Sequence, residues 1–344
     1  MALSVGIIRT RYLGDVILLV PLIREIQRFD PEARVTVVVN EGTAYPLEHF
    51  PGVRVLTLSR GSRLSRWGST LALGAELSRS SFDLLLDLTV SDRSRLLTRL
   101  ARPGKSGAAG DKDDRRSGDP WDTYLPVDLN HGPEHVIVMH KRLLSMLGVS
   151  DSGILDKGYD PDPVWVDRAA SWTTERGLSS TPLLFLHPGG RHWFKRWSPD
   201  RFARLGQCWI ERTSGAAIVI GSGDESTLVD SVINGLSPAD QNRVYSLTGA
   251  PVGLLDALVR TARVFVGSDS GPLHMADAAH VPVVGLFGST LPEVWGPTSS
   301  PRRAVLSHRV SCSPCRHTGC AEGEGNCLAR ISVGEVWAQV DRWL

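Results

Sequence analysis

The sequence predicts an α/β protein of two domains, each with a parallel sheet covered by helices. Short apolar runs alternate with segments whose apolar residues recur at helical spacing, and 344 residues are too many for one small core. The prolines of the Asp-Pro-Asp-Pro run at 160–163 bias the residues before them away from helix, as expected of a linker. We therefore expect domains over 1–160 and 161–330 and a final helix over 331–344.

The first half of the chain alternates strands and helices. Four apolar runs predict buried strands, at residues 3–8, 34–39, 53–58 and 82–88. Helical spacing begins at Val16, ends at Asp30-Pro31, and returns over 134–147. Residues 99–119 are polar, glycine-rich and charged with both signs, which predicts a mobile excursion. This excursion is either a tolerated surface insertion or a cover over a bound molecule.

The second half repeats the alternation. Apolar runs predict strands at residues 183–186, 216–220, 243–247, 264–266 and 281–287. Helical spacing predicts helices at residues 199–213, 253–260, 273–280 and 331–344. This pattern indicates a second parallel sheet.

Composition excludes several classes of protein. With 42% hydrophobic residues the chain can bury two cores, and a net charge of +1 argues against binding nucleic acid through bulk charge. No run approaches the roughly 20 apolar residues of a membrane span, and the N-terminus has no basic leader. We therefore expect a cytoplasmic protein without a transmembrane segment, whose five cysteines are thiols or metal ligands.

The stretch from Arg263 to Pro297 is the most informative, because a strand, a small-residue turn, a helix and a second strand follow one another there. Free backbone N–H groups and the positive end of a helix dipole favour a phosphate at such a turn. A turn that merely caps the helix fits equally well. The residues concerned are Asp269, Ser270, Gly271, Pro272, Leu273 and His274.

Another turn follows the first predicted strand. Arg11, Tyr12 and Gly14 precede Asp15 at the carboxyl end of that strand, the edge where ligands bind in open α/β sheets. Asp15 either caps the next helix or acts as a base on a hydroxyl group.

A third turn follows the first strand of the second domain. Gly189 and Gly190 come before Lys195 and Arg196, two cations that suit a diphosphate because they stabilise developing negative charge. A solvated tip is the alternative for the cations, and His187 is expected to be a buried structural histidine.

A fourth turn carries Asp224 and Glu225 after the strand at 216–220. Acidic residues at this position accept hydrogen bonds from ribose hydroxyls or cap the following helix.

Four of the cysteines lie close together in the sequence: Cys312, Cys315, Cys320 and Cys327. Their spacing is compact enough for a four-thiolate structural zinc site, although it is not that of a common zinc ribbon. Reduced thiols without a metal are the alternative.

These motifs, in this order, resemble those of glycosyltransferase family 9, the ADP-heptose heptosyltransferase family. Residues 269–276 resemble its D-[ST]-G-x-x-H-x-A run, and 288–292 its G-x-[ST]-x-P turn. Residues 187–199 resemble its [HN]-P-G-[AG]…K-x-W-x-P pattern, and 7–26 its opening [RK]-x-x-x-x-G-D-[VIL] signature.

The resemblance implies the GT-B architecture, two Rossmann-like domains facing each other across a cleft, with the last helix packing back on the first domain. It implies metal-independent, inverting transfer of a heptose from ADP-heptose to a hydroxyl of a lipopolysaccharide core sugar or of a small natural-product acceptor. No cofactor is required for catalysis, and a lipid acceptor would bring peripheral contact with the inner membrane.

The resemblance also implies roles for residues. Asp15 is the catalytic base, and Lys195 is the catalytic cation that meets the diphosphate. Acceptor-binding roles fall to Arg11, Tyr12 and Gly14. Donor-binding roles fall to Gly189, Gly190, Arg196, Asp224, Glu225, Asp269, Ser270, Gly271, Pro272, Leu273 and His274, with Glu225 preferred for the ribose. Two other classes stay open: a sugar-nucleotide epimerase or hydrolase, which would need no acceptor, and a non-catalytic nucleotide-sugar-binding protein, which would tolerate loss of Asp15.

Overall fold

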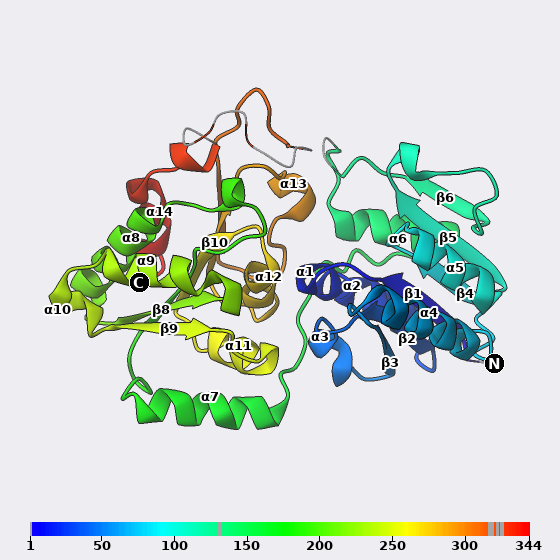
Figure 1. Ribbon diagram of the computed structural model, residues 1–344, viewed down its shortest axis with the longest axis horizontal. Coiled ribbons are helices and arrows are strands. Elements are labelled where there is room, and N and C mark those ends of the chain that lie inside the picture. The colour runs from blue at the N-terminus through cyan, green and yellow to red at the C-terminus, as the bar shows by residue number, and fades with distance from the viewer. Residues whose placement is uncertain (1, 130–131, 316–319, 321–322, 324–326) are drawn as a thin grey trace. The chain divides into compact units, whose positions relative to one another are not determined.

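The computed structural model describes residues 2–129, 132–315, 320, 323 and 327–344 (Figure 1). The chain divides into two compact units, Met1–Asp160 and Pro161–Leu344. Each unit holds one six-stranded sheet, ordered β3-β2-β1-β4-β5-β6 in the first and β12-β11-β10-β7-β8-β9 in the second. The strands of both sheets pair in parallel, which confirms the predicted α/β class.

The first unit alternates strands and helices along the chain. Its strands are β1 (Ser4–Arg9), β2 (Arg34–Asn40), β3 (Val53–Leu58), β4 (Leu84–Asp87), β5 (Lys105–Gly110) and β6 (Thr123–Pro126). Its helices are α1 (Leu13–Ile17), α2 (Val20–Phe29), α3 (Tyr45–Glu48), α4 (Arg63–Leu77), α5 (Asp92–Ala101) and α6 (Val136–Met146), with a 3₁₀ turn, η1, at Lys112–Asp114.

The second unit repeats this plan. Its strands are β7 (Leu183–His187), β8 (Ala216–Gly221), β9 (Val244–Thr248), β10 (Val264–Ser268), β11 (Val283–Phe287) and β12 (Arg303–Ser307). Its helices are α7 (Pro163–Glu175), α8 (Pro199–Thr213), α9 (Ser226–Asn234), α10 (Pro238–Gln241), α11 (Val252–Val259), α12 (Gly271–Ala278), α13 (Pro292–Trp295) and α14 (Val333–Asp341). The 3₁₀ turns are η2 (Trp193–Lys195), η3 (Gly223–Glu225) and η5 (Cys327–Arg330).

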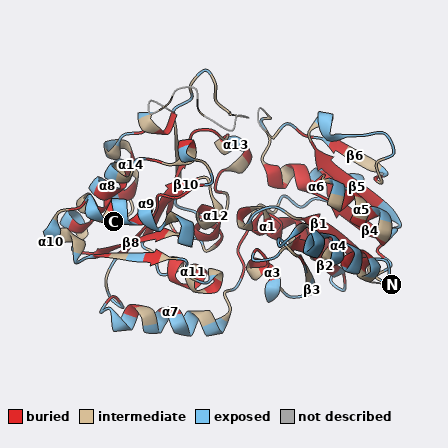
Figure 2. Cartoon of the chain, in the orientation of Figure 1, coloured by how far each residue is buried: buried red, intermediate tan, exposed pale blue. Residues whose placement is uncertain are grey.

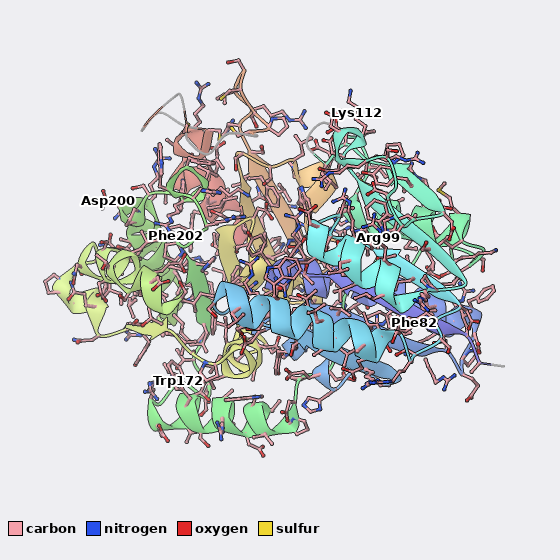
Figure 3. The ribbon with its side chains drawn as sticks, turned by 45° about the vertical axis from the view of Figure 1, so that its right-hand side comes forward. Phe82, Arg99, Lys112, Trp172, Asp200 and Phe202 are labelled. Atoms are coloured by element: carbon pink, nitrogen blue, oxygen red, sulfur yellow. The ribbon has the colours of Figure 1, made fainter. Side chains whose placement is uncertain are left out.

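The central strands are continuous apolar runs because helices cover both faces of each sheet. All residues of β1, β4, β7 and β10 are buried, the class that Figure 2 colours red. Phe82 and Phe202, labelled in Figure 3, each lie in the core of their own unit. None of the helices in the described residues is both long and apolar enough to cross a membrane.

The predicted mobile excursion at 99–119 is wrong, because much of it forms β5. The strand escapes a search for apolar runs because its residues are small, yet five of its six positions are buried. A Cβ on Gly107 would lie 2.9 Å from Cδ1 of Leu143, so the lack of a side chain lets α6 approach the sheet. The turn that follows β5 is held by Arg95, whose Nε lies 2.7 Å from the Asp119 carboxylate.

The last helix packs its apolar side within the second unit, and its packing on the first domain stays a prediction. Val336 and Val340 of α14 are fully buried in the core of the second unit, where α14 contacts α8. Just before α14, the carbonyl of Ile331 accepts a hydrogen bond from the Trp197 indole at 2.9 Å. The apolar side of the helix is therefore used within the second unit.

A buried ion pair anchors the segment that leads out of the first unit. Lys141 and Glu25 are each 1% exposed, and Nζ lies 2.9 Å from Oε1. Burial raises the pKa of Glu25, but hydrogen bonds from Ser152, Lys141 and Ile154 outweigh it, and the pKa is lowered overall. Farther along, the Arg24 guanidinium donates to the Asp156 carboxylate at 2.8 Å and to the Gly158 carbonyl at 2.6 Å.

Replacing Lys141 by Met leaves the Glu25 carboxylate buried without its cation. We expect Lys141→Met to lower the free energy of unfolding of the first unit by about 3–5 kcal/mol. Urea denaturation followed by circular dichroism measures the change. The matched control is Arg54→Gln, which breaks the exposed pair with Glu76 and should cost less than about 1 kcal/mol. Equal losses in both variants would contradict the assigned role of the buried pair.

Candidate active site

Each sheet reverses its strand order at one point, and most of the predicted site residues gather there. The reversal lies between β1 and β4 in the first unit and between β7 and β10 in the second. Connections leave such a point toward opposite faces of the sheet, which opens a crevice at the carboxyl ends of the two strands. Each unit therefore offers one ligand-binding edge.

Asp15 lies at the reversal point of the first unit, in α1 just beyond β1. Its Oδ1 pairs with the Arg9 guanidinium, and its Oδ2 accepts a hydrogen bond from the Tyr12 backbone N–H at 3.1 Å. The side chain is 14% exposed. The carboxylate is thus held in one direction while an edge of it stays accessible. Arg11 and Tyr12 are exposed on the same turn, and Gly14 is buried there.

Arg9 is the residue of this turn to which the sequence analysis gave no role, although it opens the matching motif. It is the last residue of β1, is 6% exposed, and also donates a hydrogen bond to the Leu88 carbonyl beyond β4. The guanidinium therefore joins the two strands that border the crevice. The available signal was a cation ending an otherwise apolar strand, a position that requires a nearby anion.

Asp269 lies at the reversal point of the second unit and gathers three polar side chains. Its Oδ2 is 3.6 Å from Lys195 Nζ and accepts a hydrogen bond from Thr290 Oγ1 at 2.7 Å, and its Oδ1 is 3.6 Å from His274 Nε2. Burial raises the pKa of Asp269, but His274, Lys195 and Thr290 lower it overall. Lys195 is thereby placed beside the start of α12, with its side chain 24% exposed.

His187 and Glu225 form a second polar group beside the first. His187 Nδ1 lies 3.1 Å from Ser270 Oγ, and Nε2 lies 3.9 Å from Glu225 Oε2. Burial lowers the pKa of His187 to about 4, so the ring is neutral at pH 7. Glu225 accepts hydrogen bonds from the backbone N–H groups of Gly190 and Ser222, each at 2.9 Å.

Comparison with known proteins identifies the family. A model of glycosyltransferase family 9 (heptosyltransferase) matches residues 70–325. The chain belongs to this family. Lipopolysaccharide heptosyltransferase 3 of Escherichia coli K12 is 25% identical over 316 residues, which is 89% of each chain.

Solved structures show the fold. A family 9 glycosyltransferase of Veillonella parvula DSM 2008 gives a TM-score of 0.83 at 20% identity, covering 99% of this chain and 96% of that one. An E. coli heptosyltransferase with ADP-2-deoxy-2-fluoro heptose gives 0.69 at 18% identity, covering 99% of both. The protein is a glycosyltransferase with the GT-B fold, as the motifs predicted.

The residues predicted to bind the donor in this family 9 glycosyltransferase do not all turn toward one point. The Arg196 guanidinium donates to the Gly190 carbonyl at 2.9 Å, which closes the turn that precedes it. Asp224 is exposed on η3, whereas the neighbouring Glu225 is half-buried. A Cβ on Gly189 would lie 2.4 Å from Glu225 Oε1, so a larger residue there would displace the Glu225 carboxylate.

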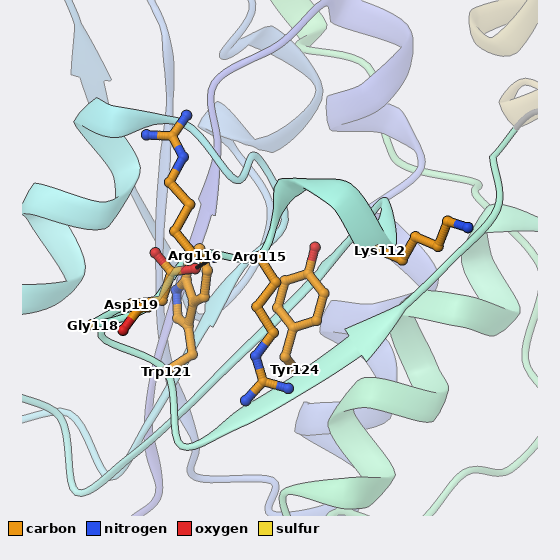
Figure 4. Close-up of a pocket in the computed structure, with 8 residues that line it drawn as sticks. Lys112, Arg115, Arg116, Gly118, Asp119, Trp121 and Tyr124 are labelled. Carbon is orange, nitrogen blue, oxygen red and sulfur yellow. Dashed lines mark hydrogen bonds between the residues drawn. The ribbon is translucent and has the colours of Figure 1, made fainter.

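The glycosyltransferase has a further polar cavity in its first unit, of about 470 Å³ (Figure 4). Its lining includes Lys112, Arg115 and Arg116 together with Trp121 and Tyr124. The Arg115 guanidinium lies 5.6 Å from the centre of the Tyr124 ring. Cations and aromatic rings of this kind favour an anionic ligand, but the cavity belongs to the turn after β5 and not to the crevice beside Asp15.

The four clustered cysteines of the glycosyltransferase follow β12, and two of them, Cys315 and Cys327, lie against the turn after β11. The Cys315 N–H donates to the Ser289 carbonyl at 2.8 Å, and a Cβ on Gly288 would lie 3.0 Å from Cγ of Leu328. Burial and the nearby thiols raise the pKa of Cys315 to about 11. In the described part of the chain no three His, Cys, Asp or Glu side chains form a group that could hold a metal. Most of the segment between Cys315 and Cys327 lies outside the described residues, and the predicted zinc site stays a prediction.

The neutral His187 makes the stability of the glycosyltransferase depend on pH. Its pKa is about 4 in the folded protein and near 6.5 in the unfolded chain, so between these values the unfolded chain binds more protons. Stability is therefore full above about pH 6.5 and is lost as the pH falls toward 4. We expect the thermal midpoint of His187→Asn to fall less than that of the wild type when the pH drops from about 7 to about 5.

Differential scanning calorimetry at both pH values measures this difference. The control is His49→Asn, which changes an exposed histidine of the first unit and should keep the wild-type pH dependence. Identical pH dependence in His187→Asn and the wild type would mean that His187 does not titrate as described.

Proposed function

We propose that this glycosyltransferase moves a heptosyl residue from ADP-heptose to a hydroxyl group of a sugar acceptor of the lipopolysaccharide core class, with inversion at the anomeric carbon. The observation that carries the proposal is the place of Asp15, a fixed and accessible carboxylate at the reversal point of the first sheet. Support for the donor comes from the E. coli heptosyltransferase solved with an ADP-heptose analogue, and support for the acceptor class comes from the name of the curated relative.

In the acceptor half of the reaction, Asp15 takes the proton. Its carboxylate accepts the proton of the acceptor hydroxyl as the oxygen attacks the anomeric carbon. Arg9 orients the carboxylate through Oδ1, while Tyr12 N–H holds Oδ2. The two contacts limit rotation of the side chain, so the base needs little reorganisation when the acceptor arrives.

In the donor half of the reaction, the second unit binds the diphosphate. The bond from the anomeric carbon to the diphosphate oxygen breaks, and ADP leaves with its negative charge. Lys195 and the backbone N–H groups of Gly271 and Leu273 at the start of α12 are suited to stabilise that charge. Asp269 acts by positioning, because it binds Lys195 through one oxygen and faces His274 with the other. An attack from the face opposite the leaving diphosphate inverts the anomeric centre.

Removing the base should stop transfer without unfolding the protein. We expect Asp15→Asn to lower kcat by about 10²- to 10⁴-fold, since the amide cannot accept the proton. Lys195→Met should lower it by about 10²- to 10³-fold. Release of ADP from ADP-heptose, with and without a lipopolysaccharide core acceptor, is the measurement. The matched control is Asp167→Asn, an exposed position on α7 that should keep full activity.

Two results of that assay would contradict the proposal. Release of ADP without an acceptor, at the rate seen with one, would make the protein a sugar-nucleotide hydrolase. Donor binding without turnover, unchanged by Asp15→Asn, would make it a non-catalytic binding protein.

We also propose that catalysis is independent of metal, since Lys195 and the start of α12 supply the positive charge. Saturating EDTA should leave the initial rate within about twofold of the untreated enzyme. The rate after EDTA is compared with that after adding back Mg²⁺ or Zn²⁺. A loss that either ion restores would assign a catalytic metal and contradict this part of the proposal.

A further inference from the structure

Helix α4 carries an apolar face that is exposed to solvent. Leu64, Trp67 and Leu71 are 84%, 51% and 57% exposed. Their spacing of three and four residues places them on one side of the helix. The remaining positions on that side are small and also exposed: Gly68, Ala72 and Ala75. We call these six residues the α4 face, and Figure 2 shows pale blue along the helix.

Packing in the core does not explain the α4 face. The opposite side of α4 already supplies the core with Leu73 and Leu77. Gly74 on that side lies against Leu100 of α5, closely enough that a Cβ would collide with it. The helix is thus fixed to the first unit by one apolar side while a second apolar side points outward. Exposed large side chains gathered on one helix mark a binding surface.

Positive charge surrounds the start of the α4 face. The sequence from Ser59 to Ala75 contains three arginines and no acidic residue. Arg60 and Arg66 are exposed, and Arg60 donates to the Arg11 carbonyl at 2.9 Å. Arg93 donates to Thr70 Oγ1 at 3.0 Å and to the Arg66 carbonyl at 3.3 Å. These described partners are uncharged oxygen atoms, so they do not cancel the charge of the guanidinium groups.

The positive charges of Arg66 and Arg93 repel each other at this end of α4. Burial and the neighbouring charge of Arg66 lower the pKa of Arg93. An anion placed beside this end of α4 would relieve the repulsion. An apolar helix face with arginines at its border, a tryptophan on it and no acidic residue within it has the composition of a helix that lies in a lipid interface.

We propose that the α4 face binds the surface of an anionic lipid bilayer. Leu64, Trp67 and Leu71 enter the boundary between headgroups and acyl chains, and the arginines meet lipid phosphates. A protein partner fits less well, because a stable protein interface buries about 800 Å² on each side, more than this one helix face offers. The proposal does not depend on the sugar that the enzyme transfers, since binding is measured without substrates.

The test is co-sedimentation of the full chain with vesicles. We expect the wild type to sediment with an equimolar mixture of phosphatidylglycerol and phosphatidylcholine and to stay in the supernatant with phosphatidylcholine alone. The double variant Leu64→Ser/Leu71→Ser should lower the partition coefficient about tenfold or more. The double variant Arg60→Gln/Arg66→Gln should lower it by a similar factor, and added salt should weaken wild-type binding.

The matched control removes exposed apolar side chains elsewhere. Val164 and Val166 of α7 are 56% and 43% exposed, and Val164→Ser/Val166→Ser should bind vesicles as the wild type does. Circular dichroism and the thermal midpoint verify that each variant is folded, as expected for changes at exposed positions.

Three outcomes would overturn the proposal. The first is wild-type protein that stays in the supernatant with both vesicle types. The second is equal binding by the wild type and Leu64→Ser/Leu71→Ser. The third is self-association in analytical ultracentrifugation that the leucine variant abolishes, without vesicle binding, since a second copy of the chain would then cover the α4 face.

Discussion

The whole arrangement depends on the reversal of strand order at the centre of each parallel sheet. A parallel strand needs a crossover to reach its neighbour, and the crossovers on either side of β1/β4 and of β7/β10 leave toward opposite faces. Only there do connections leave the carboxyl ends of two neighbouring strands toward opposite faces of the sheet. Asp15 occupies that place in one unit and Asp269 in the other. The central strands themselves are buried, so polar groups gather at these edges.

At these edges each carboxylate is paired with cationic or polar side chains. Asp15 has Arg9, and Asp269 has Lys195 and His274. Such partners stabilise the charge of a carboxylate in a half-buried turn. The same partners determine where its oxygens point. In these turns the cation therefore both stabilises the carboxylate and orients it. A substitution that removes the cation leaves the carboxylate free to rotate.

The sequence predicted the architecture well wherever burial alone determines the residue types. The central strands are apolar runs, and several of the turns rich in small and polar residues follow the strands at the reversal points. It failed at β5, whose small residues serve close packing against α6 and look like a loop. Spacing alone also does not say which core receives the apolar side of α14, because such a side fits either core. The role of Arg9 was missed because its partners Asp15 and Leu88 meet it only in the folded sheet.

The anchoring of the exit segment has a mechanical consequence. Glu25 holds Ser152 and Ile154, and Arg24 holds Gly158, so the backbone is secured to the first unit almost to its last residue. The second unit begins at Pro161, and prolines at 161 and 163 each fix one backbone torsion. The segment that joins the units is therefore short and has few free backbone torsions.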